Sequence, residues 1–360
     1  MGGAEPVMKR CAVWFGLFAL ILTGCGDGGG FGQRTRTAIA IRQLGSADAN
    51  TQDKAIQTLA KIGVEAVPDL IDVLDDEKPQ VRRGAAIVLG GIGPPAAAAV
   101  PKLKACVADG EADVRMWAAS ALVSVAATDA EVVALVLKLL EDESAQVRSA
   151  TAHWIRKARA SVDVVVRALA ETLRDPDQHV RHAALRSLRG LGPQARDAAP
   201  AVIGLLGAED PGLFSDALWV LSEIGGDAQA ARAVLEAALA SQDEAVRYEA
   251  AHFLAERFRS DAEACVPALL AALRQRHWAD ARRALVSLAS VGPQAAAAAP
   301  AILESLQHEQ WEMRQAAAVA LGAIGPAAKE AIPALTKALS DDDEDVRAAA
   351  AEAIKKIETR

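Results

Sequence analysis

Aromatic side chains are scarce in this sequence of 360 residues: they make up 4% of it, and Tyr occurs once. Hydrophobic residues nevertheless amount to 52%, so Ala, Leu and Val supply most of the apolar surface. Small apolar side chains let helix axes approach closely. The composition therefore favours a protein built from closely packed helices.

An excess of positive charge is also absent. The chain has 39 Lys and Arg against 47 Asp and Glu, a net charge of -8 and a pI near 5.4. A nucleic-acid-binding protein needs a basic surface that neutralises phosphates. The charge balance therefore argues against a nucleic-acid partner.

Motifs of common enzyme sites are missing as well. The sequence contains no Gly-rich phosphate loop, no nucleophile elbow and no Cys-x-x-Cys pair. The acidic loops lack the alternating spacing and closing Glu of a calcium loop. We therefore predict that the protein is not an enzyme and has no cofactor, no metal ligands and no catalytic residues.

The first residues have the features of a processing signal. Lys9 and Arg10 precede a short apolar run at residues 11–22, which is followed by the sequence Leu-Thr-Gly-Cys ending at Cys25. This sequence resembles the lipobox of bacterial lipoproteins, in which the signal peptidase cuts before a Cys that then carries lipid. An ordinary secretory signal is the alternative, and Met8 is an alternative start to Met1.

The lipobox divides the chain into a signal peptide at residues 1–24, a lipidated Cys25 with a Gly-rich tether at 25–34, and a folded part at 35–360. It implies a protein of the cell envelope that is anchored to a membrane by lipid and faces the periplasm or the exterior. Which membrane holds the anchor is left open. Of the remaining cysteines, Cys106 and Cys265 lie too far apart in the repeat array for a disulfide, so we predict buried thiols.

Self-similarity is the dominant feature of the folded part. One residue position recurs every 33 residues or nearly so, and we call it the phase position. An offset is counted in residues after it. The ten phase positions are Gln52, Arg82, Arg115, Arg148, Arg181, Phe214, Arg247, Ala281, Arg314 and Arg347.

A small residue follows each phase position at offset three, as at Ala184, and a branched aliphatic residue at offset seven, as at Leu188. Offsets three, seven and ten fall on one face of a helix. Each repeat therefore contains a helix, here called a phase helix, with a small residue where a neighbour crosses it. Gly93 and Gly325 are among the predicted left-handed C-caps.

A second helix follows in each repeat, for example at 66–74, 266–273 and 332–339. It has Pro in its first turn, where a missing N–H costs little. Acidic residues such as Asp343 precede the next phase helix, where they can cap its N-terminus.

The combined pattern, V-R-x-x-A-A-x-x-L-x-x-I-G-P followed by a helix that starts with Pro, resembles the HEAT repeat, in the short subtype also found in phycobilin lyases. It covers nearly all of residues 35–360. The resemblance implies an all-α fold, an α-solenoid of about ten helix pairs in a right-handed superhelix. Phase helices would line the concave side, and no separate domains are expected.

The Arg residues at the phase positions have two interpretations: a ligand-binding stripe, or bridges between repeats to acidic loops. We favour bridges. Relatives of this subtype include di-iron hydroxylases that act on deoxyhypusine and carry His-Glu pairs just after the Arg. Here Arg181 is followed by His182-Ala183, and the only His-Glu pair, His308-Glu309, lies in a loop. The hydroxylase ligands are thus absent.

Offsets one, two and five should face the concave side. In repeats three to eight they place large polar and aromatic residues there, which we predict to form one partly exposed groove: Met116, Trp117, His153, His182, Arg186, Trp219, Tyr248, Glu249, His252 and Arg282. Aromatic residues with a polar group favour recognition. The alternative is that the aromatic rings fill gaps between Ala-rich helices.

We therefore predict a scaffold, anchored to a membrane by its lipid, that binds a protein or peptide in its groove. Two alternatives stay open. One is an enzyme similar to the phycobilin lyases or hydroxylases of this subtype, and the other is a structural spacer in the envelope.

Overall fold

The computed structural model describes residues 30–359, apart from 160, 208–209, 226–227, 259–261 and 275–277. These residues form α-helices and short 3-10 turns, and none of them is in a strand. The predicted signal peptide and Cys25 lie outside the described residues. Helix α2 begins at Gly30, so residues 30–34, which were expected to belong to the tether, are helical.

The chain divides into two compact units, with the boundary between Val202 and Ile203. Both units consist of the same repeated helices, as the predicted α-solenoid requires. The boundary lies in α12 (Ala199–Gly204), close to the place where the sequence departs from the repeat: Ala208 replaces an acidic residue and Phe214 replaces the phase Arg. Phe214 is fully buried, so it serves as an apolar core residue at a position where four other repeats have an Arg that bridges to an Asp.

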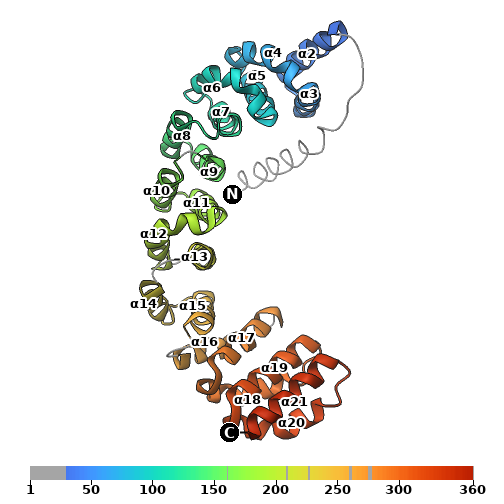
Figure 1. The fold of residues 1–360 in the computed structure, drawn as a ribbon, viewed down its shortest axis with the longest axis vertical. Helices are drawn as coiled ribbons and strands as arrows, with labels where there is room; N and C mark the ends of the chain where they lie inside the picture. Colours follow the sequence, from blue (N-terminus) through green and yellow to red (C-terminus); the bar gives the residue numbers. More distant parts are fainter. Residues whose placement is uncertain are drawn as a thin grey trace. The chain divides into compact units, whose positions relative to one another are not determined.

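The first unit contains α-helices that alternate between second helices and phase helices (Figure 1). Its helices before α12 are α2 (Gly30–Leu44), α3 (Ala49–Ile62), α4 (Val67–Asp72), α5 (Pro79–Ile92), α6 (Val100–Cys106), α7 (Ala112–Val125), α8 (Ala130–Leu137), α9 (Ala145–Trp154), α10 (Val162–Thr172) and α11 (Gln178–Leu191). In this unit α5, α7, α9 and α11 form one layer, and α4, α6, α8 and α10 form the other.

The second unit has the same alternation. Its helices are α13 (Pro211–Ile224), α14 (Ala228–Ala238), α15 (Glu244–Arg257), α16 (Val266–Leu273), α17 (Trp278–Val291), α18 (Ala299–Ser305), α19 (Trp311–Ile324), α20 (Ile332–Ala338) and α21 (Glu344–Glu358). Within the described residues, each of the ten odd-numbered helices from α3 to α21 carries a phase position and follows a second helix. The ten phase helices predicted from the sequence are thereby confirmed; within the described residues nine of them are followed by a second helix, α21 is not, and α2 precedes the first.

Short 3-10 turns connect or extend these helices and account for small differences from the predicted bounds. The second helix expected at 66–74, for example, is α4 followed by a 3-10 turn. The turns are η1 (Gly63–Ala66), η2 (Val73–Asp75), η3 (Pro94–Ala99), η4 (Lys138–Glu141), η5 (Ile155–Lys157), η6 (Gly192–Ala198), η7 (Leu205–Gly207), η8 (Ala262–Cys265), η9 (Gly292–Ala298) and η10 (Gly325–Ala331).

The core follows the predicted offsets. The small residues at offset three are at most 1% exposed in all ten repeats, and the branched residues at offset seven are buried in every repeat except the last, where Ile354 is half-buried. Gly93 and Gly325 have the positive φ expected of caps, but their ψ values of -145° and -142° are extended and not left-handed helical. Only glycine adopts this region readily, and it turns the chain into the next 3-10 turn.

Four of the seven phase Arg residues form the bridges favoured from the sequence. Arg115 donates two hydrogen bonds to the carboxylate of Asp142, at 2.7 and 2.8 Å, and a third to the carbonyl of Asp109, at 2.9 Å. Arg82, Arg148 and Arg314 repeat this pattern with an Asp that lies 27 residues further on. These four guanidinium groups are therefore engaged in structural ion pairs, whereas Arg181, Arg247 and Arg347 donate to backbone carbonyls of the loop before their own helix.

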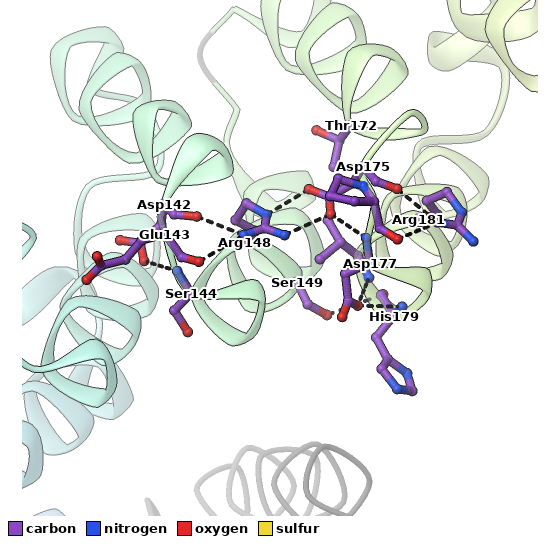
Figure 2. A network of polar contacts seen from close by, with 12 residues as sticks. Asp142, Glu143, Ser144, Arg148, Ser149, Thr172, Asp175, Asp177, His179 and Arg181 are labelled. Atoms are coloured by element: carbon purple, nitrogen blue, oxygen red, sulfur yellow. Dashed lines mark hydrogen bonds and ion pairs between the residues drawn. The ribbon is translucent and has the colours of Figure 1, made fainter. Parts of the chain in front are cut away.

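Each bridging Asp connects two successive repeats (Figure 2). The carboxylate of Asp175 accepts from Arg148, its own carbonyl oxygen accepts from Arg181 at 2.9 Å, and the backbone N–H of Asp177 donates to its carboxylate. The loop before each phase helix is thus fixed from both sides. We call these chains of contacts the Arg–Asp ladder.

The ladder should make stability depend on acid pH. Burial alone would raise the pKa of Asp142, but hydrogen bonds from Arg115 and Ser144 outweigh it, and the pKa lies below its ordinary 3.8. A carboxyl with a lowered folded-state pKa stabilises the protein above its unfolded pKa, and this stabilisation is lost as the pH falls.

We therefore expect the urea concentration at the unfolding midpoint to stay constant between about pH 7 and 5 and to fall steeply at about pH 3. Asp142→Asn should start from a lower midpoint and lose less on acidification, because it has one fewer carboxylate to protonate. An equally steep loss in this variant would contradict the assignment to Asp142.

Candidate binding face of the phase helices

Several residues at offset five of the phase helices are exposed to solvent. Arg186 and Trp219 are exposed at this offset, as are Val286 and Val319. Offset one instead points toward the next phase helix: the Ser149 hydroxyl donates to the His179 carbonyl and the Tyr248 hydroxyl to the Asp280 carbonyl, both at 3.3 Å. Positions four residues apart, which we placed on one stripe, therefore have different surroundings.

Two predicted groove residues are buried as a result. Met116 is 2% and Tyr248 is 7% exposed, so the prediction that their side chains stay partly exposed is wrong. The thioether of Met116 accepts from Gln146 in the next repeat. Burial raises the pKa of Tyr248 to about 12. Both side chains fill the space between adjacent phase helices, which is the alternative that the sequence left open.

Trp117, His153, His182 and Arg186 carry the predicted face in the first unit. Trp117 is half-buried, and its ring centroid lies 5.4 Å from that of Trp154, which is buried. His153 and His182 are half-buried, and the exposed Arg186 donates to the His182 carbonyl at 3.3 Å. Burial, with the charges of nearby cations, lowers the pKa of His153 to about 4. The imidazole of His153 is therefore neutral at pH 7.

Glu249, His252 and the buried Tyr248 form a polar cluster in the second unit. The Tyr248 ring stacks on His252 with the centroids 6.0 Å apart. Arg283 lies over the Tyr248 ring at 5.6 Å and bonds Glu249 at 3.4 Å. Arg283 was not among the predicted residues, although it occupies offset two of its own repeat. Arg282, which was predicted, is exposed.

One part of this cluster has the residue types of a hydrolase. Ser287 Oγ lies 2.6 Å from His252 Nδ1, and His252 Nε2 lies 3.8 Å from Glu256. A nucleophile must reach its substrate, but Ser287 is 0% exposed and also donates to the Arg283 carbonyl. The contact therefore serves packing between α15 and α17.

Neither cysteine that we predicted to be buried has a disulfide partner. Cys106 and Cys265 are buried, and burial raises the pKa of each thiol to about 11. Within the described residues no group of three or more His, Cys, Asp or Glu side chains is placed to hold a metal ion.

Two apolar stretches, Trp278–Ser305 and Trp311–Ala338, are long enough to cross a membrane by length and composition. Each consists of a phase helix, a Gly-Pro 3-10 turn and a second helix of the same repeat, and about half of each is buried in the protein. Their apolar faces are used for packing between repeats.

The exposed face contains an apolar row in the second unit. Trp219, Val286 and Val319 are 52%, 42% and 48% exposed, and all three occupy offset five, on α13, α17 and α19. A shallow depression between α19 and α21 adjoins the row and is lined by Val319, Gly322 and Glu352, among others. These three positions share one offset, so they lie on the same face of their helices.

Comparison with known proteins agrees with this architecture. A family model for HEAT repeats matches residues 37–123, 166–255 and 266–355, which is most of the chain. The protein therefore belongs to the HEAT-repeat family. No curated protein sequence matches the chain.

Solved structures show the same fold at low sequence identity. The chain is similar to an engineered protein, with 22% identity and a TM-score of 0.55 over 89% of this chain and 98% of that one. It is also similar to a chain from the structure of Kap95p binding to RanGDP, with 17% identity and a TM-score of 0.55 over 89% of this chain and 50% of that one. These similarities establish an α-solenoid.

Proposed function

We propose that this protein is an envelope scaffold, anchored to a membrane by its lipid, whose phase-helix face binds an extended segment of a protein partner. The exposed row of Trp219, Val286 and Val319 carries the proposal. These three side chains do not contribute to the core, which is formed by the buried residues at offsets three and seven. HEAT-repeat solenoids with an exposed helix face are suited to protein binding.

The spacing of the row indicates the kind of segment that fits. Adjacent packed helices lie about 8–10 Å apart, and an extended chain advances roughly 3.3 Å per residue. Two apolar side chains about six residues apart in the partner could therefore contact Trp219 and Val286, which are two helix spacings apart, and a third about three residues further on could contact Val319. Trp219 has the largest exposed apolar surface in the row and should act as the anchor.

Replacing the anchor should reduce binding without harming the fold. We expect Trp219→Ala to weaken partner binding by about 2 kcal/mol, or roughly thirtyfold. Trp311→Ala is the matched control, because Trp311 is 38% exposed at the start of α19 but lies outside the row. Isothermal titration with the purified partner measures both. Equal losses in the two variants would contradict a role for the row.

The anchor to the membrane rests on the sequence Leu-Thr-Gly-Cys at Cys25. We expect Cys25→Ser to remove all fatty acid from the protein, since the thiol is the site of lipid attachment. Metabolic labelling with a radioactive fatty acid in a bacterial host measures this, and Cys106→Ser is the control that should keep its label. Label retained in Cys25→Ser would refute the anchor.

The other functions have less support. A hydroxylase of this repeat subtype carries His-Glu pairs just after the phase Arg, and the sequence has none at those positions. A structural spacer needs no exposed apolar row. The interaction scaffold is the function that makes use of the row.

A further inference from the structure

The phase-helix face of the first unit has a positive charge, although the protein as a whole is acidic. At offsets one, two, five, eight and nine of repeats three to five there is no Asp or Glu. The same positions carry His153, Arg156, Lys157, His182, Arg186 and Arg189. With a net charge of -8 for the whole chain, this local excess is not a consequence of composition.

Two of these side chains make no ion pair within the described residues, although Arg186 donates to the backbone carbonyl of His182. Arg156 and Arg186 are exposed. By contrast, Arg82 and Arg148 in the same unit pair with carboxylates of the ladder. Within the described residues, no carboxylate lies within ion-pair distance of Arg156 or Arg186. Both guanidinium groups can therefore accept an outside anion.

Arg156 lies against α11, the helix that carries Arg186. A Cβ atom added at Gly190 on α11 would lie 3.4 Å from Cδ and 3.7 Å from Nη1 of Arg156, so Arg156 extends from the end of α9 across the next phase helix. The charges of Arg156, Lys157 and Arg186 all act on His153, which burial keeps neutral. We call His153, Arg156, Lys157 and Arg186 the basic patch.

We propose that the basic patch binds an acidic stretch of the protein partner, in which Asp or Glu carboxylates pair with Arg156 and Arg186. This inference rests on the proposed function and names the chemistry of the segment. From Trp117 on α7 to Arg186 on α11 the face spans two helix spacings, about 20 Å. An extended chain covers that distance with about six residues. Arginine is suited to this role because its planar group pairs with carboxylates through two parallel hydrogen bonds.

A membrane surface fits the patch less well. Peripheral binding to anionic lipid usually combines charge with exposed apolar side chains that enter the acyl boundary. In the described part of the first unit, the exposed large hydrophobic side chains are Ile39, Val64 and Val164, and all three lie outside the patch. Among the described residues the patch itself offers only the half-buried Trp117 as an apolar neighbour.

A labelled peptide of ten Glu and Asp residues tests the proposal with the full-length chain, and fluorescence anisotropy measures its binding. The peptide in which Gln and Asn replace these residues is the first control. We expect the acidic peptide to bind, more weakly as salt is added, and the amide peptide not to bind. Arg156→Ala with Arg186→Ala should weaken binding at least about tenfold.

Arg167→Ala with Arg196→Ala is the matched control variant. Both arginines are exposed in repeats four and five but lie on α10 and η6, so this pair removes the same charge from outside the patch. We expect binding to stay within about twofold of the unaltered protein. An equal loss in the two double variants would overturn the proposal, because it would show only a response to net charge.

Two more readouts separate the proposal from its rivals. If the acidic peptide binds at the patch, its carboxylates should raise the pKa of His153 from about 4, a shift that NMR detects. Binding of phosphatidylglycerol vesicles, but not of the peptide, with loss in Arg156→Ala and Arg186→Ala, would overturn the proposal in favour of a lipid headgroup. If the acidic peptide fails to bind while Trp219→Ala still weakens a purified partner, this inference falls and the proposed function stands.

Discussion

Arg115→Ala should be among the most destabilising single substitutions in the first unit. Both members of the Arg115–Asp142 pair are buried, with side chains 9% and 6% exposed. Removing the guanidinium leaves a buried carboxylate without its partner and two backbone carbonyls, of Asp109 and Gly110, without their donor. Breaking a buried pair in this way costs about 3–5 kcal/mol.

Arg347→Ala is the matched control for this prediction. Arg347 is the last phase Arg, and its Nη1 donates to the carbonyls of Asp341 and Asp342 at 2.7 and 2.9 Å. Losing ordinary hydrogen bonds should cost about 1 kcal/mol each. Urea unfolding followed by circular dichroism measures the two variants. A cost for Arg115→Ala no greater than that for Arg347→Ala would mean that the ladder does not hold the repeats together.

Gly322→Val should have the largest effect in the second unit. Helices α19 and α21 cross so closely that a Cβ atom added at Gly322 would lie 2.8 Å from Cα and 3.0 Å from Cβ of Ala353. Because the obstacle is backbone, it cannot turn aside as a flexible side chain can. Overpacking of this kind costs about 1–3 kcal/mol, and we expect the upper end of that range.

Gly190→Val separates the clash from the intrinsic effect of Val in a helix. Both glycines lie near the ends of phase helices, but an added Cβ at Gly190 meets only the movable Arg156 side chain. We therefore expect Gly190→Val to change the unfolding free energy by less than about 1 kcal/mol. Thermal unfolding by calorimetry compares the two variants. Similar melting temperatures would show that α19 and α21 can separate without cost.

The sequence predicted the fold well at positions that make the same kind of contact in most repeats. Offsets three and seven are buried because they share the helix face toward the second helices, and a period of 33 residues repeats that geometry. The bridging role of the phase Arg was also predictable, because an Asp follows Arg115 after 27 residues and recurs at the same interval elsewhere.

The candidate site was harder to predict. Offsets one and five differ by only about 40° around the helix, yet Tyr248 at offset one is buried and Trp219 at offset five is exposed. The difference in exposure arises because the next phase helix covers offset one, and a helical-wheel projection of a single helix does not include its neighbour. Arg156 was missed because it lies at offset eight, outside the offsets assigned to the groove, and extends over Gly190 of the following repeat.

The boundary between the two compact units has no counterpart in the apolar repeat pattern. The sequence pattern of small and branched residues continues through Ala217 and Leu221, so the helical repeat itself gives no sign of a boundary. The sign lies in the polar pattern, where Phe214 replaces the phase Arg and Ala208 replaces the acidic residue. Polar bridges hold the repeat loops, so their pattern carries information that the apolar period does not.

Site-directed photo-crosslinking is the most direct test of the claim that a protein partner binds the exposed face of the phase helices. A photoreactive side chain at Trp219 or Val286 reports on the apolar row, and one at Leu339 reports on an equally accessible site, 41% exposed at the end of α20 in the other layer. We predict a crosslinked protein partner from positions 219 and 286 and none from position 339. Equal crosslinking from all three positions, or crosslinking from position 339 alone, would contradict the claim.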